Sequence, residues 1–268
     1  MKLIRGAASL ALVLALTACS RGGAAWRAAA PAAADPDESG YLRPPGQLSA
    51  QRGPSGVVVS GRSGPEVRVR LSSPPPNGVA YGATARDDGQ WSITTPDSPT
   101  VGLFGIAEEL AGRDVQGEGY VAILPRPGPP AALLRAGGGA SMLVPSPSVG
   151  LKITAVDYDG SGAAVVSGLA HPGTPVRLFV DGVAAGEARA GDRGRFSISL
   201  AGMLKPGAHD LRAASADQAA DAKISVDSPR PITGRPYRGE RSATGWRIDW
   251  LTPGGGEQTT LIFDSVGS

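Results

Sequence analysis

Short runs in which apolar and polar residues alternate recur along the chain from residue 57 onward. Val67–Leu71 alternates in this way, and Trp91–Ile93 does so again after the turn dipeptide Asp88-Gly89. An alternation with a period of two is typical of a strand that buries one face. Aspartate or asparagine followed by glycine is common turn chemistry between two such strands. The pattern therefore predicts a mostly β chain.

Further stretches extend this prediction, and one leaves two alternatives open. Gly119–Leu124 and Ala132–Leu134 are predicted strands, and Ile153–Val156 is predicted to form a hairpin with Ala164–Ser167. Leu103–Leu110 is compatible with one or two helical turns or with another strand, because its periodicity favours neither.

The C-terminal section begins as a linker rich in proline and arginine and ends in a predicted hairpin. Its strands are Trp246–Leu251 and Thr259–Phe263. Trp246 and Trp250 lie on one face of the first strand, because alternate residues of a strand point to the same side. An exposed face of this kind could stack on sugar rings or dock a partner, whereas a buried one would be core.

An internal repeat relates two parts of the chain. Four short matches occur in the same order, at offsets of 104 to 109 residues, so small differences in loop length account for the drift. Repetition of this kind indicates a duplicated module. The matches pair Val58–Gly61 with Val165–Gly168, Val67–Val69 with Val176–Leu178, Gly78–Gly82 with Gly182–Gly186, and Asp88–Ile93 with Arg193–Ile198.

The second copy resembles the bacterial Ig-like modules of surface and periplasmic proteins. The residues that carry the resemblance are Gly168–Leu178, Asp181-Gly182 and Asp192–Ser197, and it covers 165–227 well and 57–140 more loosely. The first copy departs from the pattern at Gly61–Pro65, which lacks the Ala-x-Pro-Gly portion. The resemblance implies two tandem Ig-like β-sandwich domains, an architecture that hosts many functions.

The N-terminus has the composition of an export signal. Lys2 and Arg5 precede the apolar run Ala7–Leu16, which at ten residues is too short to span a bilayer. If Lys2 and Arg5 are removed with the signal, 24 basic residues remain against 24 acidic ones. This balance gives no support to nucleic-acid binding, which needs a clustered positive surface.

The signal ends in a sequence that resembles the lipobox of bacterial lipoproteins, Leu16-Thr17-Ala18-Cys19. The resemblance implies cleavage before Cys19, attachment of a diacylglycerol to its thiol and acylation of the freed amine, for example with palmitate, so that two or three chains anchor the protein stably in a membrane. Ser20 follows, and by the sorting rule of the family a residue other than aspartate there implies the outer membrane, with its periplasmic or outer side left open. An ordinary secretory signal with an accidental cysteine is the alternative.

Cys19 is the single cysteine of the chain, so its acylation leaves no thiol for disulfides, nucleophilic catalysis or metal binding. The predicted organisation is a signal peptide at 1–18, an acylated cysteine with a disordered tether at 19–54, Ig-like domains at 55–147 and 148–228, and a linker with a C-terminal hairpin at 229–268. The composition of 20–54, rich in alanine, proline and glycine, favours the tether.

One segment has the spacing of oxygen ligands for calcium. Asp157 and Asp159 precede Gly160 in a short polar run, but an EF-hand loop would carry glutamate where Gly168 stands. A hairpin turn is the favoured interpretation, with calcium as the alternative. No other metal site and no cofactor is expected.

No motif of nucleophilic, metal-dependent or nucleotide-dependent catalysis is present in the sequence. We therefore expect a non-enzymatic, lipid-anchored envelope protein that acts in interaction, adhesion or assembly, with the membrane, another envelope protein or the cell wall as its partners. The alternative is a lipoprotein that binds carbohydrate or peptidoglycan through Trp246 and Trp250.

Overall fold

The computed structural model describes residues 44–76, 78–110, 112–144, 150–227 and 230–264. Strands, turns and loops make up this part of the chain, and it contains no helix. The strands pair in antiparallel fashion into four sheets. The predicted fold class, two tandem Ig-like sandwiches with a C-terminal hairpin, is confirmed.

The first module consists of a three-stranded sheet and a six-stranded sheet that enclose one apolar core. The smaller sheet has the order β1-β2-β5 and the larger one β4-β3-β6-β7-β8-β9. The strands are β1 (Gly46–Gly53), β2 (Gly56–Arg62), β3 (Arg68–Ser72), β4 (Ala80–Thr84), β5 (Gln90–Thr95), β6 (Gly102–Leu110), β7 (Arg113–Ile123), β8 (Ala131–Leu134) and β9 (Ser141–Met142).

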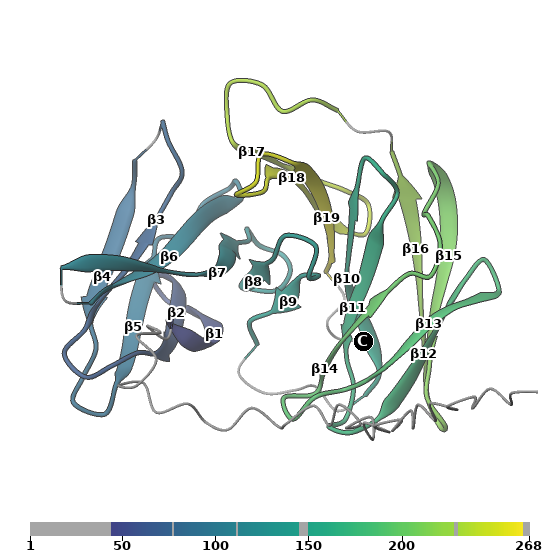
Figure 1. The fold of residues 1–268 in the computed structure, drawn as a ribbon, viewed down its shortest axis with the longest axis horizontal. Helices are drawn as coiled ribbons and strands as arrows, with labels where there is room; N and C mark the ends of the chain where they lie inside the picture. The colour runs from purple at the N-terminus through teal and green to yellow at the C-terminus, as the bar shows by residue number, and fades with distance from the viewer. Residues whose placement is uncertain (1–43, 77, 111, 145–149, 228–229, 265–268) are drawn as a thin grey trace, which may run out of the picture. The chain divides into compact units, whose positions relative to one another are not determined.

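The second module has a six-stranded sheet of order β14-β11-β10-β19-β18-β17 and a four-stranded sheet of order β13-β12-β15-β16. The four strands of the smaller sheet lie side by side in Figure 1. The strands are β10 (Lys152–Asp159), β11 (Ala164–Leu169), β12 (Pro175–Val180), β13 (Val183–Arg189), β14 (Arg195–Ser199), β15 (Gly207–Ala214), β16 (Ala219–Val226), β17 (Tyr237–Arg241), β18 (Gly245–Leu251) and β19 (Glu257–Phe263).

The two modules share one strand order, which explains the sequence repeat. The set β1-β2-β5 corresponds to β10-β11-β14, and β4-β3-β6-β7 corresponds to β13-β12-β15-β16. Each module then carries additional strands, β8 and β9 beside β7 in the first and β17 to β19 beside β10 in the second. The duplicated unit is therefore a seven-stranded sandwich.

A glycine opposite an aromatic residue recurs at the same place in both copies. Gly61 pairs with Trp91 across β2 and β5, and Gly168 pairs with Phe196 across β11 and β14. A Cβ atom on Gly61 would lie 2.4 Å from the Trp91 ring, and one on Gly168 would lie 2.3 Å from the Phe196 ring. The aromatic ring occupies the space that a side chain would need, which explains why these two motifs repeat together.

The structure corrects the predicted start of the first domain. Residues up to 54 were expected to form a tether, but Gly46–Gly53 is strand β1 and pairs with β2. Leu48 and Ala50 point from this strand into the core of the first module. Two apolar positions flanked by proline and glycine give too weak an alternation to be recognised in the sequence.

The structure also decides between helix and strand for Leu103–Leu110, and it shows that the C-terminal hairpin belongs to the second module. Gly102–Leu110 is β6, a strand central to the larger sheet of the first module. The predicted hairpin is present as β18 and β19, but 229–268 is not a separate appendage, because β19 pairs with β10 along five residues. The hairpin is thus part of the second module's sheet.

A cluster of buried apolar residues joins the two modules. It combines side chains of β6, β7, β8 and β9 with side chains of β10, β18 and β19, all within one compact unit of the chain. Its members with 1% exposure or less are Leu103, Ala122, Leu124, Ala132, Leu134, Ala140, Met142, Ala155, Ile248, Trp250 and Ile262. The strands added to each sandwich therefore form the interface between the sandwiches.

Candidate functional site

A buried carboxylate links the two modules at this interface. Asp157 on β10 accepts hydrogen bonds from the backbone N–H of Ala140 at 2.7 Å, from Thr260 Oγ1 at 2.6 Å and from Gln258 Nε2 at 3.1 Å. Ala140 belongs to the loop between β8 and β9 of the first module, whereas the other residues belong to the second. We call Asp157, Gln258, Thr260 and Ala140 the interface cluster.

Gln258 fixes the same loop at two more points. Its Oε1 accepts a hydrogen bond from the N–H of Gly137 at 3.0 Å, and its Nε2 also donates to the carbonyl of Arg135 at 3.3 Å. Gly139 comes so close to β11 that a Cβ atom on it would lie 2.6 Å from Ser167 Oγ. Residues 135–140 are therefore held against the second module by both hydrogen bonds and packing.

The environment of Asp157 changes its proton affinity. Burial raises the pKa of its carboxyl group to about 6, although the hydrogen bonds from Thr260, Ala140 and Gln258 act in the opposite direction. Burial penalises the charged form of an acid, and here that penalty exceeds the stabilisation that three donors supply.

We expect this carboxyl to make the folded chain less stable as pH rises from about 4 to about 6. The folded state holds the proton more tightly than the unfolded state, whose pKa is 3.8. The effect of this carboxyl on the free energy of unfolding is absent below both pKa values and reaches a loss of about 3 kcal/mol above pH 6. Urea unfolding of the chain and of an Asp157→Asn variant across this range measures the effect.

The difference in unfolding free energy between the two proteins should change with pH only over that range. Other carboxyl groups titrate alike in both proteins and cancel in the difference. A difference that stays constant between pH 4 and pH 7 would contradict the assignment.

Asp157 and Asp159 have different neighbours in the structure. Asp159 accepts hydrogen bonds from the N–H and the hydroxyl of Ser161, at 2.8 and 2.6 Å, within the turn between β10 and β11. The carboxylate of Asp157 is already bonded to three donors. Within the described residues no group of three or more acidic, histidine or cysteine side chains is placed to hold a metal ion. The turn that was favoured over calcium is present.

The tryptophan pair lies in the interface between the modules. Trp250 is fully buried; its indole N–H donates to Thr260 Oγ1 at 3.0 Å, and its ring meets Tyr120 edge-on at 5.7 Å. Trp246 is 7% exposed, and the guanidinium of Arg241 lies 5.4 Å from its ring centroid. Both rings are buried, so of the two alternatives that the sequence leaves open for this strand face, core and binding surface, the structure shows the core.

The residues of the predicted lipid anchor lie outside the described part of the chain. This applies to Leu16, Thr17, Ala18 and Cys19, and to the tether up to residue 43. Among the described residues there is no helix with the length and apolar character that crossing a membrane requires.

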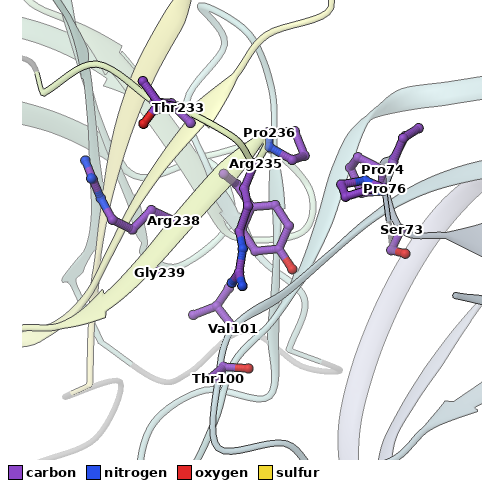
Figure 2. Close-up of a pocket in the computed structure, with 13 residues that line it drawn as sticks. Ser73, Pro74, Pro76, Thr100, Val101, Thr233, Arg235, Pro236, Arg238 and Gly239 are labelled. Carbon is purple, nitrogen blue, oxygen red and sulfur yellow. The ribbon is translucent and has the colours of Figure 1, made fainter. Parts of the chain in front are cut away.

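A pocket of about 350 Å³ brings together segments that are far apart in the sequence (Figure 2). The loop after β3 contributes Ser73 and three prolines, the residues just before β6 contribute Thr100 and Val101, and the segment before and within β17 contributes the rest. Gly239 permits the close approach, because a Cβ atom there would lie 2.6 Å from Val101 Cβ. The lining residues are Ser73, Pro74, Pro75, Pro76, Thr100, Val101, Ile232, Thr233, Arg235, Pro236, Tyr237, Arg238 and Gly239.

The two arginines of this pocket differ in their partners. Arg238 points away from the cavity in Figure 2, and its Nη2 donates to Asp249 at 3.1 Å. Arg235 extends toward Val101 and makes no ion pair within the described residues. Prolines, hydroxyl groups and one available guanidinium suit the binding of a polar or acidic segment, and the lining holds no nucleophile next to a base. The sequence shows a linker rich in proline and arginine here, but no pattern in it indicates that the proline loop after β3 lies beside this linker.

Comparisons with known proteins identify no family for this chain and find only distant structural similarity. No family model matches the chain, and no curated protein matches it. A solved structure entitled "Biofilm associated protein - BSP domain" has 18% identity and a TM-score of 0.23 over 70% of this chain, which spans 30% of that structure. The central fibronectin-III array of RIM-binding protein has 13% identity and a TM-score of 0.25, with 82% of this chain and 89% of that one covered. A two-domain fibronectin type-III segment of chicken tenascin has 13% identity and a TM-score of 0.22, with 69% and 100% covered.

Proposed function

We propose that the protein is a lipid-anchored component of the bacterial envelope that binds another envelope component without catalysing a reaction. Cys19 would carry the lipid, and Ser20 after it favours the outer membrane by the sorting rule of lipoproteins. The two sandwiches would then present a binding surface at the end of the segment that follows the anchor.

The open edges of the second module carry this proposal. In its four-stranded sheet, β13 and β16 each pair with one neighbour, and within the described residues no strand pairs with their outer edges, although the N–H of Ala201 after β14 donates to the carbonyl of Ala185 on β13 at 3.0 Å. Val183, at the start of β13, is 70% exposed. An unpaired edge offers a row of N–H and C=O groups to which an extended segment of a partner can add as a strand.

Replacement of Cys19 by alanine should abolish both acylation and membrane attachment. Metabolic labelling with a palmitate analogue, followed by separation of inner and outer membranes on a density gradient, measures both properties. The unmodified chain should carry the label and sediment with the outer membrane. Label retained after Cys19→Ala, or recovery of the unmodified chain with the inner membrane, would contradict the anchor or its sorting respectively.

A photo-crosslinking residue at position 183 tests the binding edge in intact cells. We expect one dominant crosslinked protein or wall fragment at this position. The matched control is the same residue at position 254, which is exposed in the turn between β18 and β19, where a Cβ atom has no heavy atom within 4 Å. Equal adducts at both positions, or no adduct at 183, would count against strand addition at β13.

A further inference from the structure

A small pocket is lined by three arginines, of which one belongs to the first module and two belong to the second. Its volume is about 210 Å³. Arg135 follows β8 of the first module, whereas Arg193 and Arg195 lie in the turn before β14 and at the start of that strand. Apolar side chains of the first module, among them Leu48 and Leu133, line the same space.

The charge of this arginine pocket is not balanced. Glu118 is the one carboxylate of its lining; its Oε2 lies 3.7 Å from Arg135 Nε, and its side chain is 75% exposed. Arg135 also donates from Nη1 to Ser141 Oγ at 3.1 Å. Arg193 and Arg195 form no ion pair in the part of the chain that the structure describes. Three guanidiniums against one carboxylate leave a local charge of about +2 at neutral pH.

Arg195 shows the electrostatic cost of this arrangement. Its Nε is buried and has no hydrogen-bond partner in the described part of the chain. Burial lowers the pKa of its guanidinium, and the positive charges of Arg193 and Arg135 lower it further. A buried donor without an acceptor is unfavourable, and so are three like charges in one place; an anion in the pocket would reduce the repulsion between the three guanidiniums.

The positions of these arginines depend on the interface between the modules. The carbonyl of Arg135 accepts a hydrogen bond from Gln258, and five residues later Ala140 donates to Asp157. These contacts hold the loop that begins at Arg135 against β11 and β19 before any ligand arrives. A site that is already assembled loses less entropy on binding.

We propose that this pocket binds a phosphate monoester carried on a small apolar group. A phosphate monoester has a charge of about −1.5 to −2 at pH 7, which matches the local charge of about +2. The planar guanidinium presents paired donors that fit phosphate oxygens. The apolar part of the lining, to which Pro44, Leu48 and Leu133 contribute, would contact the body of the ligand. A monoester on a lipid and a soluble monoester share this chemistry.

Calorimetric titration of the chain from residue 20 onward tests the proposal, with phenyl phosphate, inorganic phosphate and benzoate as ligands. Phenyl phosphate should bind roughly tenfold or more tightly than either of the others, since inorganic phosphate lacks the apolar body and benzoate carries a single negative charge and no phosphate oxygens. Benzoate binding as tightly as phenyl phosphate would overturn the assignment to phosphate, and absence of phenyl phosphate binding would overturn the site.

Arg195→Gln and Arg193→Gln should each weaken phenyl phosphate binding by about tenfold or more. Arg193 is exposed in a turn, so its variant keeps the test valid if Arg195→Gln does not fold. Arg177→Gln is the matched control, because Arg177 is exposed, lies on β12 and pairs with Glu187 at 3.7 Å outside the pocket. An equal loss in Arg177→Gln would show general charge attraction and contradict the site.

Sedimentation with vesicles that contain phosphatidic acid separates the two sources of the monoester. We consider first the case in which the chain binds these vesicles, phenyl phosphate releases it, and Arg193→Gln weakens the binding. This result would assign the pocket to a lipid headgroup. Binding of phenyl phosphate in solution without vesicle binding would assign it to a soluble monoester. If neither phenyl phosphate nor the vesicles bind, the proposal of a phosphate-binding pocket is rejected. The proposals for the lipid anchor and for the β13 edge do not depend on this result.

Discussion

Replacement of Trp250 by alanine should lower the free energy of unfolding by about 3–5 kcal/mol, the usual cost of removing a large buried aromatic side chain. Trp250 is fully buried among side chains of both modules, so the cavity would open in their common interface. The variant also loses the indole hydrogen bond to Thr260 and the ring contact with Tyr120. Urea unfolding followed by circular dichroism measures the change.

Met203→Ala provides the control for this experiment, since Met203 is 72% exposed and apolar. Its unfolding free energy should stay within about 0.5 kcal/mol of the unmodified chain. A loss below about 1 kcal/mol for Trp250→Ala would mean that Trp250 does not hold the modules together as described.

Gly168→Ala should destabilise the second module by about 1–3 kcal/mol or more, because a single added methyl group has no space. Its Cβ would lie 2.1 Å from the carbonyl oxygen of Lys152 and 2.3 Å from the ring of Phe196. Rotation of the Phe196 ring would not remove the clash, because the carbonyl of Lys152 belongs to strand β10 and can move only with the backbone. The unfolding free energy of the variant measures the cost.

Gly202→Ala is the matched control, because a Cβ atom there would have no heavy atom within 4 Å. The repeat adds an internal comparison: Gly61→Ala meets the Trp91 ring at 2.4 Å and should also destabilise the chain. Stability of Gly168→Ala equal to that of Gly202→Ala would contradict the role assigned to the repeated glycine.

The duplicated sandwich could be predicted from the sequence because its signals are local. Alternating residues, turn dipeptides and four ordered matches lie within single strands or between neighbouring ones. Strand β1 was missed because Leu48 and Ala50 are its buried apolar residues, and their neighbours favour a loop.

The interface between the modules could not be predicted, because alternation indicates which residues share a face but not what covers that face. In β18 the sequence Trp-Arg-Ile-Asp-Trp suggests one buried and one solvated side. Both sides are buried: Arg247 is 5% exposed and Asp249 4%, and Arg247 Nε donates to Asp249 at 2.9 Å. Arg247 and Asp249 can be buried because they are paired with each other. In the sequence, such a strand shows the same alternation as a strand with one face in solvent.

The two pockets escaped prediction for a related reason. Arg135 and Arg193 are separated by more than fifty residues, as are Pro74 and Arg235 by more than a hundred and fifty. Each pair meets only because β17 to β19 join the second module to the added strands of the first. No pattern within a single stretch of sequence carries that information.

The central claim is that both sandwiches and the C-terminal hairpin form one cooperative unit through the shared apolar interface. Differential scanning calorimetry of the chain from residue 20 onward tests it most directly. We predict a single transition whose calorimetric enthalpy equals its van't Hoff enthalpy. Two separable transitions, each with the enthalpy expected of one sandwich, would contradict the claim.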